Sequence, residues 1–192
     1  MLLVVDATNT YTQDMSSLQH DERVAVARLH ALLELLPTAL DRHLAGHDLT
    51  AFEYTLLEAL DEAEFGRLRL SVLASRTNAT LPRLSRVATG LERRGLITRA
   101  ACEEDGRATN AVLTDAGRRM VDAVRPTYED GVRSLILGGL DPTGVAQLAD
   151  TAYAILDRLD PSRRFAVIAG RPPADAPSDD ASCPADPRLP AA

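Results

Sequence analysis

Lysine and tryptophan are absent from this chain of 192 residues, and aromatic residues make up only 4% of it. All 21 basic residues are therefore arginine, whose guanidinium stays charged at physiological pH. With so few rings, Leu, Val, Ile and Ala must supply the core. No run of roughly eighteen apolar residues occurs, which excludes a membrane-spanning helix and predicts no membrane partner.

Cysteine is also scarce, because only Cys102 and Cys183 are present, in dissimilar segments. That placement does not suit a disulfide framework, and a reduced, cytoplasmic protein is the simpler interpretation. The apolar residues 1–5 are too few for a signal peptide and lack its basic flank. Gly-rich phosphate loops, nucleophile elbows and metalloprotease motifs are missing, so we expect neither enzyme activity nor a cofactor.

Charge is distributed unevenly along the chain. The formal net charge of −7 argues, by itself, against a nucleic-acid partner. Residues 65–119, however, hold 11 arginines and 5 acidic residues, whereas the rest of the chain holds 10 and 23. A basic segment on an acidic scaffold is typical of a DNA-contacting module.

The hydrophobic pattern divides the chain into five segments. Residues 1–18 form an N-terminal extension, and the Pro-rich residues 166–192 are predicted to be a disordered tail. Residues 19–48 predict a long helix, 49–119 a compact domain and 120–165 further helices. Because a small domain needs less apolar surface than the long helices carry, we interpret them as dimerisation helices.

Apolar residues recur every three or four positions in the first and last of these helices. In the first helix they are Val26, Leu29, Leu33, Leu36, Leu40 and Leu44. In the last they are Val145, Leu148, Ala152, Ile155 and Leu159. Pro37 is expected to kink or split the first helix, and Pro126 to bend the one before the last. Thr114 and Asp141 are predicted to cap the helices that follow them.

Cap and turn residues mark the elements of residues 49–119. Thr50 and Glu53 form a capping box at the start of one helix. Phe65–Gly66 predicts a turn, after which a short extended piece leads into a helix ending near Arg76.

The next helix begins at Thr80, carries Pro82 in its first turn and stops at Gly95. Two β-prone pieces follow, at residues 96–99 and 109–113. A short helix, a tight connection, a capped helix and a β-hairpin make a winged helix-turn-helix. The predicted fold class is therefore mainly α with a small β-hairpin wing (α+β), flanked by N- and C-terminal dimerisation helices.

The helix from Thr80 has a polar face suited to the DNA major groove. Its helical period turns Leu84, Val87, Ala88 and Leu91 to the core, and Pro82, Arg86, Thr89 and Arg93 away from it. Arginine can bind O6 and N7 of guanine together. The DNA-binding residues predicted in and around this helix are Arg76, Thr80, Arg83, Ser85, Arg86 and Arg99.

The hairpin supplies a second predicted contact. Asp105 and Gly106 form its turn signal, and Arg107 directly after them can enter a narrow minor groove. Asp105 is a suitable ion-pair partner that would hold Arg107. Arg93 and Arg94 are either DNA contacts or solvated helix-end charges.

The ordered set of these motifs resembles the MarR family of transcriptional regulators. The matching stretches are Leu91 to Arg99 (LERRGLITR), Asp105 to Arg107 (DGR) and Val112 to Gly117 (VLTDAG). The resemblance implies a homodimer on a palindromic operator, usually a repressor relieved by a small molecule or an oxidant. It also implies that Arg107 is the wing-tip arginine and that residues 80–86 start the recognition helix.

A small-molecule effector is the further partner that we expect. His30, Tyr54 and Tyr128 each place a polar group on a largely apolar helix, and we predict that they line an effector crevice. They are equally well interpreted as ordinary interior or rim residues. An effector that prefers another spacing of the two winged domains would shift the population away from the DNA-binding state.

Alternatives to a ligand-relieved repressor stay open: an activator, a winged helix that binds a protein, or a thiol or metal sensor. The basic wing disfavours a protein partner. Cys102 has acidic neighbours, which disfavour a reactive thiolate. His43 and His47 have the spacing of two metal ligands, but Gly46 between them indicates a helix end with solvated histidines. We predict no metal site.

Overall fold

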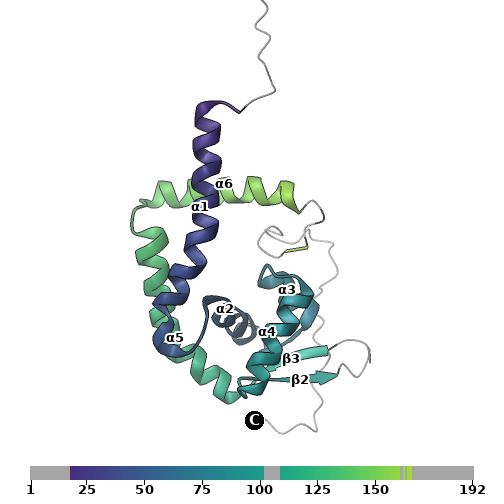
Figure 1. Cartoon of the computed structure of the whole chain (residues 1–192). Coiled ribbons are helices and arrows are strands. Elements are labelled where there is room, and N and C mark those ends of the chain that lie inside the picture. The colour runs from purple at the N-terminus through teal and green to yellow at the C-terminus, as the bar shows by residue number, and fades with distance from the viewer. Residues whose placement is uncertain (1–17, 102–108, 161, 163, 166–192) are drawn as a thin grey trace, which may run out of the picture. The chain divides into compact units, whose positions relative to one another are not determined.

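The computed structural model describes residues 18–101, 109–160, 162, 164 and 165 (Figure 1). The chain divides into two compact units, residues 1–36 and 37–192, which are described separately. Within the described ranges no helix combines the length and the apolar character that a membrane span requires.

The described part of the first unit is the N-terminal portion of helix α1 (His20–His43). Asp21 and Glu22 lie in the first turn, where carboxylates complement the helix dipole. None of the residues of α1 is buried, and Leu32, Leu33 and Leu35 are exposed. Pro37 is predicted to kink or split this helix; it lies inside α1, so the split does not occur.

The second unit contains the end of α1, the remaining helices and one small sheet. Two short 3₁₀ turns, Ala45–His47 and Glu64–Gly66, connect its first elements, and a π-helical segment, Arg133–Leu137, continues α5. The helices are α2 (Ala51–Asp61), α3 (Leu70–Arg76), α4 (Leu81–Arg93), α5 (Asp115–Val132) and α6 (Pro142–Leu159). The strands are β1 (Arg67–Arg69), β2 (Ile97–Ala101) and β3 (Thr109–Leu113).

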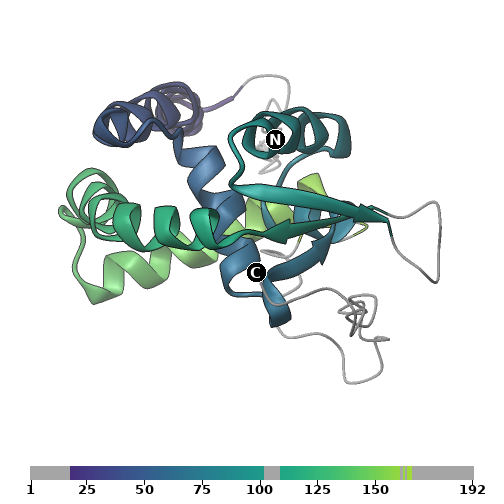
Figure 2. The same cartoon turned by 90° about the horizontal axis from the view of Figure 1, so that it is seen from below.

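The sheet is antiparallel in the order β1-β3-β2. Ile97 pairs with Leu113 at one end of the hairpin and Ala101 with Thr109 at the other. The two strands are the teal arrows that lie side by side in Figure 2. The two predicted hairpin strands are confirmed. The short extended piece before α3 proves to be a third strand, because Leu68 pairs with Ala111.

The cap residues explain where the helices begin. Thr50 and Glu53 form the predicted capping box of α2, and Thr114 accepts a hydrogen bond from the Gly117 amide. Thr80 occupies the N-cap position of α4, but its side chain makes no capping hydrogen bond. Phe65 and Gly66 both adopt positive φ, which confirms the predicted turn between α2 and β1.

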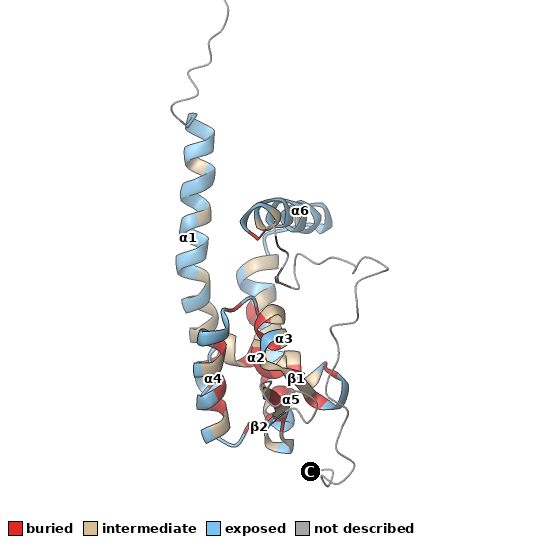
Figure 3. Cartoon of the chain, turned by 90° about the vertical axis from the view of Figure 1, so that its right-hand side faces the viewer, coloured by how far each residue is buried: buried red, intermediate tan, exposed pale blue. Residues whose placement is uncertain are grey.

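The core lies among α2, α3, α4, α5 and the sheet. Leu57, Leu84, Leu91, Ile97 and Val121 have no exposed surface. Figure 3 shows the contrast between these elements, which carry buried residues, and α6, which carries none. Residues 49–119, predicted as a DNA-binding domain, thus share one hydrophobic core with the first half of α5.

Candidate nucleic-acid interface

Helix α4 separates an apolar face from a basic one, as its period predicts. Leu84, Ala88 and Leu91 are completely buried, and Val87 is half-buried. The opposite face is exposed at Pro82, Arg86, Thr89 and Arg93, with Arg83 exposed beside it and Ser85 half-buried. Pro82 has no N–H, and the first helical hydrogen bond runs from the Leu84 amide to the Thr80 carbonyl oxygen. The amides of Leu81 and Arg83 are therefore donors at the start of the helix, next to cationic side chains.

The side chains of the described arginines of residues 65–119 fall into two groups. Four guanidinium groups, those of Arg67, Arg86, Arg93 and Arg119, make no hydrogen bond or ion pair with another described residue. The second group is engaged within the protein. Arg76, half-buried at the end of α3, belongs to this second group. Unengaged guanidinium groups on an exposed helix face are the ones that an anionic partner can bind without breaking an internal contact.

Arg83 is exposed but not unengaged. Its guanidinium lies over the ring of Phe52 on α2, 4.3 Å from the ring centroid. Such a cation–π contact contributes about 0.5–1 kcal/mol at an exposed site. Arg83 therefore connects the start of α4 to α2, and its edge remains open to solvent.

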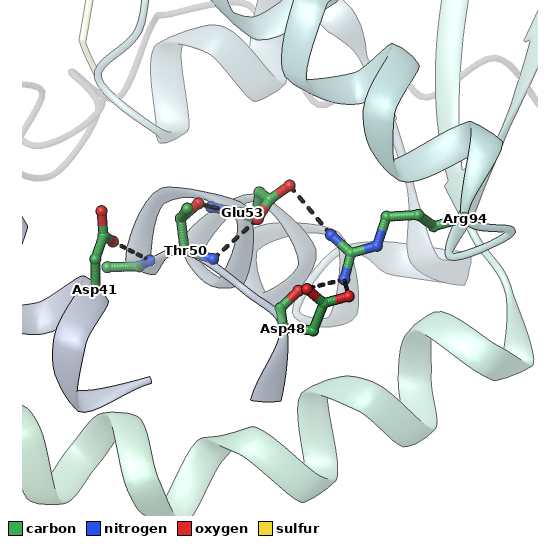
Figure 4. Close-up of polar contacts among 6 residues, drawn as sticks. Asp41, Asp48, Thr50, Glu53 and Arg94 are labelled. Carbon is green, nitrogen blue, oxygen red and sulfur yellow. Dashed lines mark hydrogen bonds and ion pairs between the residues drawn. The ribbon is translucent and has the colours of Figure 1, made fainter. Parts of the chain in front are cut away.

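Arg94, at the C-cap of α4, holds that helix to the start of α2 (Figure 4). Its Nη1 donates to Glu53 Oε1 at 3.2 Å, and its Nη2 donates to the Asp48 carbonyl oxygen at 2.5 Å. Glu53 Oε2 accepts from the Thr50 amide at 2.9 Å, while Asp41 accepts from the Ala51 amide. The sequence leaves two interpretations of Arg94, a DNA contact or a solvated charge. The structure shows a third, in which Arg94 forms hydrogen bonds within the protein.

The sequence predicts a DNA contact for Arg99, but its guanidinium lies against α4. It donates to the Ser85 carbonyl oxygen and to the Thr89 hydroxyl, and it pairs with Glu92. Ser85 and Thr89 precede Arg99 by fourteen and ten residues. They lie on another element, so the helical periodicity of the sequence does not reveal these contacts. The prediction of a direct DNA contact at Arg99 is therefore not what this geometry favours.

The candidate effector residues do not form one open site. Tyr54 is completely buried, and its ring lies 4.3 Å from the ring of Tyr128. The Tyr54 hydroxyl donates to Glu58 at 2.6 Å, and Arg125 pairs with both Glu58 and Asp61. The structure thus brings the two tyrosines together as part of a polar network between α2 and α5. His30 is an exposed residue of the first unit.

Burial raises the pKa of the Tyr54 hydroxyl, and the hydrogen bond to Glu58 raises it further. The folded protein therefore favours the protonated phenol. The resulting stabilisation is complete below pH about 10, the ordinary phenol pKa, and is lost as the pH rises above it.

We expect Tyr54→Phe to lower the free energy of unfolding by about 1–2 kcal/mol at pH 7, because Glu58 loses a hydrogen bond. It should also make the loss of stability above pH 10 less steep. Urea unfolding at pH 7 and pH 10.5 measures both effects. Tyr128→Phe is the matched control, because the Tyr128 hydroxyl has no described hydrogen-bond partner. Equal pH profiles for the two variants would contradict the assignment to Tyr54.

The two histidines near the end of α1 are predicted to be solvated, but both contact α5. His43 Nε2 lies 3.2 Å from Asp130 Oδ2, and His47 Nε2 lies 3.0 Å from Thr127 Oγ1. Gly131 makes room for the His43 ring, since a Cβ there would come within 2.9 Å of it. Among the described side chains no three potential ligands of the His, Cys, Asp or Glu type come together to hold a metal ion.

The wing tip and both cysteines lie outside the described residues. Asp105 and Arg107 belong to residues 102–108, as does Cys102, and Cys183 belongs to the C-terminal segment. The described part of the hairpin ends at Ala101 in β2 and resumes at Thr109 in β3.

Comparison with known proteins identifies relatives of this chain. The MarR family profile matches residues 47–108. AbsC, a MarR family transcriptional regulator of Streptomyces coelicolor, is 31% identical over 76% of this chain and 98% of its own, with a TM-score of 0.71. A second such regulator from that organism, solved in complex with DNA, is 29% identical over 78% and 97%, with a TM-score of 0.73.

The fold extends to more distant proteins. BpsR of Bordetella bronchiseptica is 22% identical over 70% of this chain and 99% of its own, with a TM-score of 0.61. At that identity the likeness establishes the fold alone. The match to AbsC, which this chain covers almost completely, goes further and confirms the resemblance drawn from the motifs. The chain belongs to the MarR family of transcriptional regulators.

Proposed function

We propose that this protein is a homodimer that binds a palindromic operator in double-stranded DNA. Helix α4 enters the major groove, and the β2–β3 wing contacts the adjacent minor groove through Arg107, held by Asp105. The observation that carries the proposal is the exposed face of α4, where Arg86 and Arg93 have no described partner. Arg86 is the residue we assign to base contact, with Thr80 and Ser85 beside it.

Phosphate contacts complete the proposed interface. The amides of the first turn of α4 suit phosphate oxygens, because they are donors at the start of the recognition helix. Arg76, at the end of α3 just before that helix, is proposed as a further phosphate contact, although it also has a contact within the protein. Arg83 can retain its stacking on Phe52 while its edge meets the backbone. A family member from Streptomyces coelicolor has been solved in complex with DNA, which supports DNA as the partner.

Dimerisation is proposed from apolar side chains that nothing described covers. In α6 and the segment before it, Leu140, Val145, Leu148, Ile155 and Leu159 are all exposed. In the first unit, Val26, Leu32, Leu33 and Leu35 are exposed along α1. A second copy of the chain would bury these side chains and would give the two recognition helices a spacing of one DNA turn, about 34 Å.

The proposed regulatory role is a repressor released by a small molecule that favours another spacing of the two winged domains. The paired Tyr54 and Tyr128 connect α2 of the winged domain to α5, which leads to α6. A ligand that separates these rings would alter that connection. The activator and protein-partner alternatives predict, respectively, the opposite effect on transcription and no DNA binding at all.

The test is binding of the purified protein to the DNA upstream of its own gene, at several salt concentrations. A saturable, two-fold symmetric footprint whose affinity falls steeply with salt supports the proposal. Absence of binding at low salt, both for that fragment and for random DNA, would favour the protein-partner alternative.

We expect Arg86→Gln and Arg107→Ala each to weaken operator binding by about tenfold or more. Where the arginine neutralises a phosphate, its replacement should also flatten the salt dependence by about 0.9 in logarithmic slope. Fluorescence anisotropy over a salt series measures both quantities. Arg119→Gln removes the same charge from the exposed start of α5 and should leave both nearly unchanged. If Arg86→Gln behaves like this control, the assignment of α4 is wrong.

A further inference from the structure

Arg99 connects the wing strand β2 to the recognition helix through one guanidinium group. Its Nη2 lies 2.7 Å from the Ser85 carbonyl oxygen and 2.8 Å from Thr89 Oγ1. Its Nε lies 3.5 Å from Glu92 Oε2, and only 25% of the Arg99 side chain is exposed. Nη2 thus donates both hydrogen bonds to α4, and the Glu92 carboxylate pairs with the guanidinium and offsets part of its charge.

The three partners lie on one side of α4, because positions 85, 89 and 92 are spaced by four and three residues. One side chain therefore bonds to two successive turns of the helix. Ile97 anchors β2 in the core, and Leu91 anchors α4 there, so both ends of the connection are fixed. Rotation or sliding of α4 relative to β2 would have to break these bonds.

The same contacts determine what Thr89 can offer to DNA. Its hydroxyl donates to the Ser85 carbonyl oxygen at 2.9 Å and accepts from Arg99. A hydroxyl has one hydrogen and two lone pairs, so Thr89 keeps one lone pair and its methyl group for another partner. In the major groove it can accept from cytosine N4 or adenine N6, but it has no hydrogen to donate to guanine O6 or N7.

We propose that Arg99 is a positioning residue for operator recognition. It fixes the recognition helix to the wing strand, and it orients Thr89 as a hydrogen-bond acceptor. This inference rests on the proposed function, since it assumes that α4 enters the major groove. It replaces the direct DNA contact that the sequence suggested for Arg99.

The experiment compares the full-length wild type with Arg99→Gln and Thr89→Val, using Arg119→Gln as the control for removal of one charge. Affinities for the operator and for a scrambled duplex are measured over a salt series. We expect Arg99→Gln to weaken operator binding about tenfold or more and scrambled-DNA binding less than about threefold. Its salt slope should match that of Arg119→Gln, because a positioning residue neutralises no phosphate.

A second measurement tests the path through Thr89. Thr89→Val keeps the shape of the side chain but removes its hydroxyl. If Arg99 acts through Thr89, the double variant should lose less specificity than the sum of the losses in the two single variants. Thermal unfolding checks that each variant is folded. If Arg99→Gln is not, Glu92→Gln replaces it, and is expected to reduce specificity in the same direction by a smaller factor.

Each remaining result has a distinct meaning. A salt slope lowered by about 0.9 in Arg99→Gln would show that Arg99 binds a phosphate and would overturn the inference. An unchanged ratio of operator to scrambled affinity would overturn it as well. If the wild type itself fails to bind the operator or any other duplex, the proposed function is what fails.

Discussion

Replacing Leu148 and Ile155 together by glutamate should convert the proposed dimer to monomers and reduce operator affinity by at least about 100-fold. Both side chains lie on one face of α6, seven residues apart, and are 43% and 38% exposed. Each contributes about 1.5–3 kcal/mol when buried, and each introduced carboxylate would have to leave water if the dimer formed. A monomer also loses the gain from joining two half-sites. Sedimentation and anisotropy measure the two effects.

The control for this variant lies on the same helix. Ala146 is exposed and, by helical geometry, points away from Leu148, so Ala146→Glu should leave the dimer and the operator affinity intact. If the double variant remains dimeric, another surface must form the dimer, and the apolar face of α6 would need a different partner. If it becomes monomeric but binds the operator as before, the two half-sites do not require the dimer.

Gly117→Ala should lower the free energy of unfolding by at least about 3 kcal/mol. Gly117 lies in the first turn of α5, where its Thr114 cap packs against the backbone that leads into β2. A Cβ at this position would overlap the carbonyl oxygen of Leu96 and would lie 2.6 Å from Cδ1 of Leu113. Neither neighbour can yield easily, because one is backbone and the other is buried. Urea unfolding measures the decrease.

Gly90→Ala is the matched control for that substitution. Gly90 lies inside α4, and a Cβ there would have nothing within 4 Å. The same substitution should therefore raise the free energy of unfolding by about 0.5–1 kcal/mol, through the better helix propensity of alanine. Similar stabilities for the two variants would mean that α5 can move away from Leu96 at little cost.

Local chemistry determines the parts of the fold that were predictable. The Thr50 capping box, the Thr114 and Asp141 caps and the Gly95 stop depend only on neighbouring residues. The pairing of β1 with β3 was not predictable, because the strands are far apart in sequence and β1 is very short. Pro37 interrupts the apolar pattern of the sequence, but helix α1 continues through it.

The sequence predicts which face of α4 is buried and which is exposed, but it does not predict the internal contacts of the neighbouring arginines. The burial of Leu84 and Leu91 and the exposure of Arg86 follow from helical geometry alone. By contrast, Arg94 and Arg99 look as available as Arg86 in the sequence, since all three are cations at the edge of one motif. Their acceptors lie on other elements, so only the folded chain distinguishes an internal contact from an unengaged charge.

The carboxylate of Glu53 has a consequence for how movement could pass through the winged domain. One of its oxygens caps α2, while the other holds Arg94 at the end of α4. Asp41, near the end of α1, holds the next amide of the same first turn. A displacement at the end of α1 that unwinds this turn therefore also releases α4 at its C-terminal end. The proposed recognition helix can thus be loosened without any change to the residues that we propose to face DNA.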